Sequence, residues 1–111
     1  MNVIQTPAEE RSSYFITVEL FDEQGNKVTP ASLKWKLTDM AGNVVNNRSE
    51  VTVSNPADAN VIALSGNDLA VFEDAITYRL VTVWGQYYSP SAGGNVDFRQ
   101  QIKFAIRPMI G

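Results

Sequence analysis

Few residues of this chain could carry out chemistry, because its 111 residues include neither histidine nor cysteine. Without histidine the chain lacks the usual general base near neutral pH, the usual activator of a serine nucleophile and the commonest zinc ligand. Without cysteine it has neither disulfides nor thiolate chemistry. We therefore expect a protein that is not an enzyme, that has no catalytic residues and that uses no cofactor.

One pair of carboxylates still invites a catalytic interpretation. Glu73 and Asp74 are adjacent and could suggest the acid and the base of a glycosidase. That reaction needs two carboxyl groups on opposite sides of the scissile bond, roughly 5 to 10 Å apart. Sequence neighbours rarely reach this geometry, so we interpret the pair as part of a solvated loop before a strand.

Two turns combine acids with asparagine and could in principle offer oxygen ligands to calcium. Asp22, Glu23 and Asn26 share the first turn, and Asp39 and Asn43 share the second. Calcium takes about six or more oxygen ligands, which neither turn supplies. Acids and asparagines also cap turns by bonding to their own backbone. We favour that structural role and predict no metal site.

The strongest binding signal lies in residues 85–95, where two tyrosines precede a loop rich in serine, glycine and asparagine. Tyrosine gives a large rigid contact area at low entropic cost, and the small polar residues give adaptable hydrogen bonds, as in protein-binding paratopes. The candidate binding residues are Tyr87, Tyr88, Ser89 and Asn95. The alternative is that Gly85 forms a β-bulge and the tyrosines simply continue a strand.

These tyrosines belong to the stretch around which the chain is organised, residues 76–107. Its pattern predicts two long strands joined by a loop with strong turn chemistry. In the second strand, residues 96–107 alternate between apolar and polar. In the first strand we expect Tyr78 and Leu80 to face inward and Arg79 to face outward. A hairpin this long needs a second sheet to cover its apolar face.

The earlier part of the chain supplies that cover. Strands are predicted at 13–21, 33–38, 51–53 and 61–64, and a helical turn or coil at 69–75 plugs one end. Turn signals recur about every 8 to 12 residues. The chain is therefore predicted to be all-β, an immunoglobulin-like antiparallel β-sandwich of about seven strands. A barrel is the alternative architecture.

The predicted core gathers large apolar residues from these strands. Trp35 is its central tryptophan, and Tyr78 occupies the place where such a sandwich has a tyrosine that hydrogen-bonds across its corner. The predicted members are Ile16, Val18, Leu20, Trp35, Leu37, Leu64, Tyr78, Leu80, Ile102 and Phe104. Each large side chain contributes about 1.5 to 3 kcal/mol when fully buried, so this core needs no ligand.

The length predicts a single domain over residues 1–111, with residues 1–11 as an N-terminal arm or edge strand. A net charge of −3 and scattered basic residues argue against a nucleic-acid partner. No apolar run approaches the roughly 18 residues of a membrane span. The first residues also lack the basic and apolar regions of a signal peptide, so we expect no membrane association.

Two stretches resemble known proteins. Residues 21–30, followed by Leu33-Lys34-Trp35, resemble the second and third strands of bacterial immunoglobulin-like domains of the invasin and intimin type, in which an Asp-x-x-Gly-Asn turn precedes a valine. Residues 62–69, with Tyr78-Arg79-Leu80 and the closing hairpin, look like small single-domain proteins encoded among the structural genes of tailed bacteriophages. A lone domain without tandem repeats or an export signal departs from the adhesin pattern and favours the phage proteins.

The resemblance implies a non-enzymatic structural or protein-binding module. It would be a phage or prophage virion-associated protein that docks to itself or to a larger virion protein, in the virion or in the host cytoplasm during assembly. The alternative is a carbohydrate- or cell-surface-binding module that uses Tyr87 and Tyr88 as a stacking surface.

The closing strand offers a route to docking and to a homo-oligomer. Residues 96–107 contain no proline and carry charges of both signs on the outward face. An unprotected edge of this kind can accept a strand from a second copy or from another protein, and the alternating charges would set the register. In the alternative, residues 1–6 of the arm cover that edge within the chain.

Overall fold

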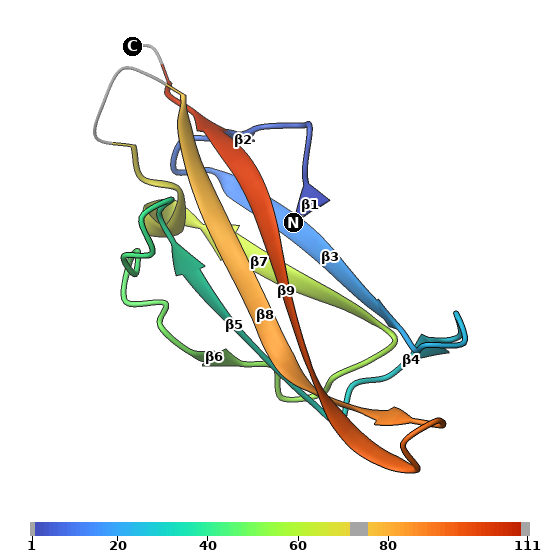
Figure 1. Cartoon of the computed structure of the whole chain (residues 1–111). Coiled ribbons are helices and arrows are strands. Elements are labelled where there is room, and N and C mark those ends of the chain that lie inside the picture. The colour runs from blue at the N-terminus through green and yellow to red at the C-terminus, as the bar shows by residue number, and fades with distance from the viewer. Residues whose placement is uncertain (1, 72–75, 110–111) are drawn as a thin grey trace.

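The computed structural model describes residues 2–71 and 76–109, and over these residues the chain is an all-β sandwich (Figure 1). Glu73 and Asp74 lie outside the described residues. The elements are β1 (Asn2–Val3), β2 (Ala8–Glu9), β3 (Ser13–Phe21), β4 (Lys27–Val28), β5 (Ser32–Thr38), β6 (Val51–Thr52), β7 (Ala59–Ser65), η1 (Gly66–Leu69), β8 (Thr77–Ser89) and β9 (Gly94–Arg107). In this part of the chain, no helix has the length and apolarity to cross a membrane.

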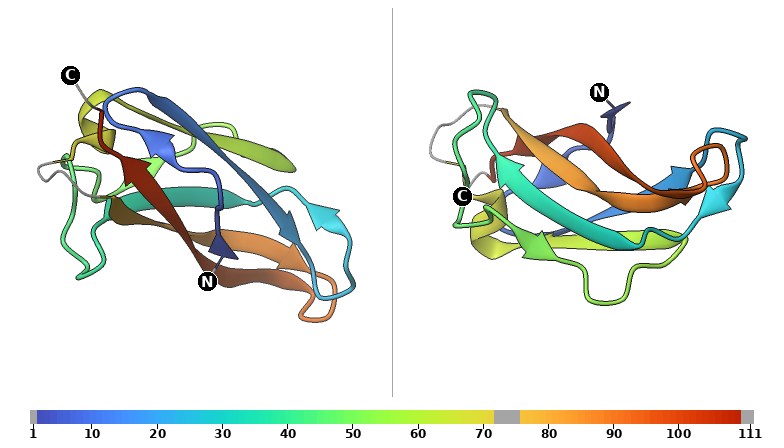
Figure 2. Two further views of the ribbon diagram at one scale, coloured as in Figure 1. Left: turned by 90° about the horizontal axis from the view of Figure 1, so that it is seen from above. Right: turned by 60° about the horizontal axis from the view of Figure 1, so that its bottom comes forward.

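The strands form two sheets that face each other across the core (Figure 2). The larger sheet has the order β1-β9-β8-β5-β6, with β2 also paired to β9, and the smaller sheet has the order β4-β3-β7. The pairings of β1 and β2 with β9 are parallel, and the others are antiparallel. Placing β3 and β7 on one sheet and β5, β8 and β9 on the other is the arrangement of an immunoglobulin-like sandwich.

The predicted hairpin is present as β8 and β9. Each of the 13 residues of β8 pairs with a residue of β9, from Thr77↔Ile106 to Ser89↔Gly94, and no residue is skipped. On β9 the inward face is the predicted one, because Ile102, Phe104 and Ile106 are all buried. The alternation of β9 therefore identified both the strand and its core face.

The predicted inward face of β8 is wrong. Val81 lies opposite Ile102 and is fully buried in the core, whereas Tyr78 is 46% exposed on the outer face. Leu80 is buried, but it lies on that same outer face. The reason is the central position of β8 between β9 and β5, which buries residues 80–83 on both faces. An apolar run buried on both faces has no polar side to mark the outside.

Tyr78 also does not take the predicted corner position. Its ring packs under the ammonium group of Lys103, with 4.6 Å between Nζ and the ring centroid. The hydroxyl of Tyr14 instead donates to the carbonyl oxygen of Thr6 at 2.5 Å. The tyrosine that ties distant backbone together is therefore Tyr14, which joins β3 to the N-terminal arm.

The smaller sheet covers the hairpin through alternate residues of β3 and β7. Ile16 pairs with Ile62 and Tyr14 with Leu64. The ring of Tyr14 stacks on Phe104 at 5.2 Å between centroids. The buried core cluster is Ala8, Ile16, Val18, Leu33, Trp35, Leu37, Ile62, Leu64, Leu69, Val71, Val81, Val83, Ile102, Phe104 and Ile106. Trp35 is 5% exposed, which confirms its predicted place in the core.

The N-terminal arm lies along β9. Asn2 pairs with Ile102 and Val3 with Lys103, and after an interruption that includes Pro7, Ala8 pairs with Ile106. Proline has no N–H to contribute to a ladder, which separates β1 from β2. The arm covers part of the β9 edge, as the intrachain alternative predicted.

One end of the sandwich is closed by η1 and the residues after it. Leu69, Ala70 and Val71 are buried there. The helical turn was predicted within residues 69–75, but the 3-10 helix spans Gly66–Leu69. The first three residues of the predicted plug are thus buried, and residues 72–75 lie outside the described residues.

We predict that Phe104→Ala lowers the free energy of unfolding by about 3 to 5 kcal/mol, because it removes a fully buried ring and leaves a cavity. The matched control is Phe15→Ala, whose ring is 65% exposed and which should change stability by less than about 0.5 kcal/mol. Urea unfolding monitored by circular dichroism measures both. Equal losses in the two variants would contradict this assignment of the core.

Candidate functional site

The structure divides the predicted binding residues between the two faces of the hairpin. Tyr87 points inward, is half-buried and meets Phe98 edge-to-face at 6.3 Å between centroids. Tyr88 points to the outer face, is 58% exposed and lies opposite Asn95. The two tyrosines therefore continue the strand, and their rings do not form one joint platform.

Ser89 has a structural partner. It is 5% exposed, and its hydroxyl donates to Glu23 Oε1 at 2.7 Å. The same carboxylate oxygen accepts the Ser91 N–H at 2.9 Å. Glu23 thereby fastens the tip of the β8–β9 hairpin to the turn between β3 and β4. Sequence analysis missed this role because Ser89 lies 66 residues beyond Glu23 and no local motif connects them.

These contacts change the acidity of Glu23. The hydrogen bond from the Ser89 hydroxyl, followed by the one from the Ser91 backbone, lowers the pKa of Glu23 from 4.5 to about 2. Both bonds stabilise the charged carboxylate. Near neutral pH the hairpin tip is therefore held by an ionised group.

Gly85 does not form a bulge, so that part of the alternative is wrong, whereas its other part is confirmed because the two tyrosines continue β8. The register passes through it continuously, with Leu33 on one side and Phe98 on the other. A Cβ at this position would lie 2.0 Å from the carbonyl oxygen of Ser32. Gly85 is required by this close backbone approach, and it gives β8 room beside the start of β5.

The turn carboxylates act as caps, as predicted. Asp22 Oδ1 accepts N–H groups from Gln24 and Asn26, both at 2.9 Å. Asp39 Oδ1 accepts N–H groups from Ala41 and Asn43 at the same distance. The Asn43 backbone bond is the largest cause that lowers the pKa of Asp39. Among the described residues, no group of three or more acidic side chains could hold a metal ion.

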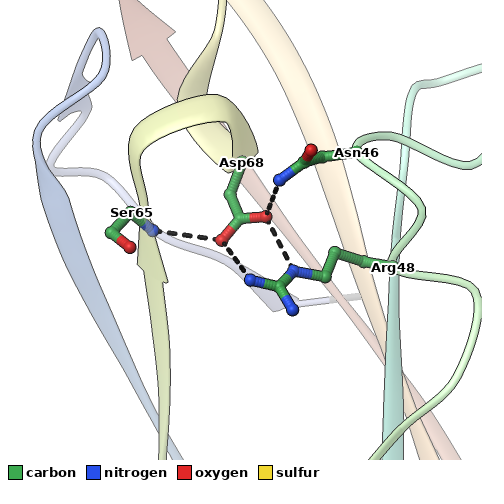
Figure 3. Close-up of polar contacts among 4 residues, drawn as sticks. All are labelled: Asn46, Arg48, Ser65 and Asp68. Atoms are coloured by element: carbon green, nitrogen blue, oxygen red, sulfur yellow. Dashed lines mark hydrogen bonds and ion pairs between the residues drawn. The ribbon is translucent and has the colours of Figure 1, made fainter.

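A buried polar cluster around Asp68 was not predicted (Figure 3). The Asp68 carboxylate is fully buried and accepts Arg48 Nε and Asn46 Nδ2, each at 2.9 Å. It also accepts the backbone N–H of Ser65 at 3.1 Å. The cluster joins η1 to the loop after β5, two segments that are about 20 residues apart.

The protonation state of Asp68 follows from opposing effects. Burial acts to raise its pKa, but the hydrogen bonds from Arg48, Asn46 and Ser65 together outweigh burial and lower it. The pKa of Arg48 is raised by the same hydrogen bond. Asp68 and Arg48 are therefore both ionised near neutral pH, and the hydrogen bonds from Arg48, Asn46 and Ser65 stabilise the buried negative charge.

The outer face of the smaller sheet is unexpectedly apolar. Phe15 is 65% exposed and Val61 is 61% exposed. They lie on adjacent strands, because Phe15 pairs with Ala63 and Thr17 with Val61. Residues that are diagonal in this way are within contact range on one face. We call Phe15, Thr17, Val61 and Ala63 the outer patch.

A recess of about 730 Å³ opens at the end of the sandwich near η1, away from the predicted binding residues. Its lining combines the charges of Arg11, Asp39 and Arg79 with apolar side chains such as Val44. Burial lowers the pKa of Arg79, and the charge of Asp39 acts in the opposite direction. Asp39 offsets only one of the two arginines, and Tyr87, Tyr88, Ser89 and Asn95 do not line this recess.

Comparisons with models of protein families, with curated proteins and with solved structures find no match.

We predict that Asp68→Ala lowers the free energy of unfolding by about 1 to 3 kcal/mol, because it removes a fully buried carboxylate that accepts hydrogen bonds from Arg48, Asn46 and Ser65. The control is Glu50→Ala, which removes the exposed ion pair with Lys34. An exposed pair contributes about 0 to 1 kcal/mol. Thermal unfolding measures both variants, and a loss no larger for Asp68→Ala than for the control would show that the Asp68 cluster does not stabilise the fold.

We also predict a pH-dependent release of the hairpin tip. Because the pKa of Glu23 is about 2 in the folded chain and ordinarily 4.5, its stabilising contribution is complete above about pH 4.5 and is lost as the pH falls toward 2. The Ser91 amide resonance in NMR spectra should titrate with a midpoint near 2, and Glu23→Gln should abolish that titration. A midpoint near 4.5 in the unmodified protein would show that the two bonds do not form.

Proposed function

We propose that this chain is a non-enzymatic structural or protein-binding module that docks to itself or to a larger protein of a phage or prophage particle. The observation that carries the proposal is the outer patch. Exposed apolar side chains that adjoin one another, unlike those scattered singly, are a feature of interaction sites. Phe15 and Val61 supply it from two strands that are already paired within the chain.

The edge beside the outer patch supports the same proposal. In the described part of the chain, β7 pairs only with β3, so its other edge is open. Its residues, Ala-Asn-Val-Ile-Ala-Leu-Ser, include no charged residue and no proline. Natural edge strands that must stay unpaired usually carry a charged residue or a proline. An apolar face next to an unprotected edge is suited to docking against another protein.

The association with a particle rests on resemblance. Residues 62–69, Tyr78-Arg79-Leu80 and the closing hairpin look like small single-domain proteins encoded among phage structural genes. A small sandwich whose outer face binds a neighbour would serve there as a docking or reinforcing element. We place the protein in the virion, or in the host cytoplasm during assembly.

The alternative function is a carbohydrate- or cell-surface-binding module, and one observation favours it. The ring of Tyr88 is 58% exposed and lies opposite Asn95, an aromatic face beside a polar side chain. Tyr87 points to the other face of the hairpin, so a sugar would have to stack on Tyr88 alone. In a glycan-array screen, Tyr88→Ala would then abolish binding and Tyr87→Ala would not.

We predict that mass spectrometry of purified particles detects this chain, and that Phe15→Ser combined with Val61→Ser strongly reduces its incorporation. The melting temperature should change little, because both side chains are exposed. Tyr88→Ser is the matched control, an equally exposed aromatic on the other sheet, and should be incorporated normally. If the chain is absent from particles made by its own phage, the proposal fails.

A further inference from the structure

The outer edge of β9 is covered over only part of its length. The arm pairs with Ile102 and Lys103 through β1 and with Ile106 and Arg107 through β2. Within residues 2–71 and 76–109, nothing pairs with this edge over residues 95–100. Figures 1 and 2 show the arm beside the C-terminal part of β9, with the hairpin tip extending past it. Half of the strand therefore presents an open edge.

The orientation of the open backbone groups follows from the covered part. The carbonyl of Lys103 accepts the Ile4 N–H at 2.9 Å, and that of Arg107 accepts the Glu10 N–H at 3.0 Å. Backbone groups alternate in direction along a strand. Asp97 and Arg99 are an even number of residues from Lys103, and β9 has no bulge between them. Their backbone N–H and C=O groups therefore point in the same direction as those of Lys103, away from β8.

The side chains of this segment include two opposite charges that are two residues apart. Asp97 and Arg99 are both exposed, have opposite charges and lie on the outer face of the sheet. Asp97 accepts the side-chain N–H of Gln86 at 3.1 Å, and the guanidinium of Arg99 lies 5.9 Å from the ring centroid of Trp84. Phe98 lies between them and points to the inner face. Neighbouring side chains thus hold both charges beside the open edge.

We propose that the occupant of this edge is the same segment of a second copy of the chain, paired antiparallel about a two-fold axis at Phe98. This inference rests on the self-docking form of the proposed function. In that register Asp97 lies opposite Arg99 of the second copy, and symmetry repeats the pair. Asp97 and Arg99 then exchange about four backbone hydrogen bonds across the axis. Phe98 faces its own copy on the inner face.

Charge selects this register over its neighbours. An axis at Asp97 places two aspartates opposite each other, and an axis at Arg99 places two arginines opposite each other. Like charges directly across a strand pair are destabilising, and opposite charges are stabilising. The Phe98 axis also brings Ile102 of the second copy opposite Gly94. Because Asn2 of the arm already pairs with Ile102, the segment free to pair in this register is residues 95–101 of each copy, and each arm borders on it.

Reversing the charges of Asp97 and Arg99 tests whether they set the register. Asp97→Arg and Arg99→Asp should each raise the dimer dissociation constant at least about tenfold, because both symmetric pairs become repulsive. The double variant exchanges the two charges and should restore the dimer. Lys34→Glu reverses a charge on the same face of the interior strand β5 and is the control that should dimerise normally. Sedimentation velocity over a concentration series measures all four, with circular dichroism to verify folding.

Cysteine cross-linking tests the axis itself, because the chain has no cysteine of its own. Residues that face each other in a non-hydrogen-bonded pair are close enough for a disulfide. Phe98→Cys should therefore cross-link to its own copy under mild oxidation. Val96→Cys should not do so alone, but should cross-link when mixed with Gln100→Cys. This register is overturned if Phe98→Cys stays uncross-linked in a folded dimer, or if the charge reversals leave dimerisation unchanged.

The outcomes separate this inference from the proposed function. A protein that is monomeric at every concentration but present in particles overturns the self-pairing and leaves docking to a larger protein intact. A charge-dependent dimer that is absent from particles supports the self-pairing and refutes the particle function. A dimer that is insensitive to the β9 variants but lost on changing the outer patch transfers self-docking to that patch and overturns the β9 axis.

Discussion

The rest of the structure depends on a difference in strand length between the two sheets. The β8–β9 pairing runs through 13 consecutive residues of β8, whereas β3 has nine residues and β7 has seven. The smaller sheet can therefore cover only part of the hairpin. Where it does, Ile102, Phe104 and Ile106 are buried, and toward the tip Tyr87 and Phe98 are only half-buried. Part of the core and the open edge of β9 are therefore two parts of one continuous strand pair.

The tip of the β8–β9 hairpin extends past the smaller sheet, and polar contacts hold it in place. Glu23 fastens the tip to the turn after β3 through the Ser89 hydroxyl and the Ser91 N–H. At the opposite end, Asp68 ties η1 to the loop that carries Arg48. Each end thus has a carboxylate whose pKa is lowered by its donors. At the tip, where Tyr87 and Phe98 are only half-buried, the polar contacts fix the geometry with little apolar burial, and at the other end Asp68 adds to the burial of Leu69 and Val71.

The sequence predicts the inward face of a strand that has one polar face. It does not predict the inward face where burial depends on which strands lie on either side. β3 and β9 alternate, so their inward residues were identified correctly, although β9 begins at Gly94, two residues before the predicted start. β8 is buried on both faces at Val81 and Thr82, and its alternation gave the wrong face. Gly85 looked like a bulge, because the nearby Ser32 carbonyl that requires glycine comes from another strand. For the candidate site, Tyr87 and Tyr88 were placed on the hairpin correctly, but the partner of Ser89 lies in a distant turn.

The open edges of β7 and β9 differ in the kind of association that they permit. β7 carries no charged residue, so sliding a partner strand along it by two residues changes little, and pairing there has no preferred register. On β9 the same slide brings Asp97 opposite Asp97 or Arg99 opposite Arg99. Opposite charges two residues apart therefore protect an edge against most partners and most registers while leaving one self-complementary register favourable. An edge of this type obtains its specificity from the same charged side chains that protect it, so strand pairing between two copies in one defined register is expected at β9 rather than at β7.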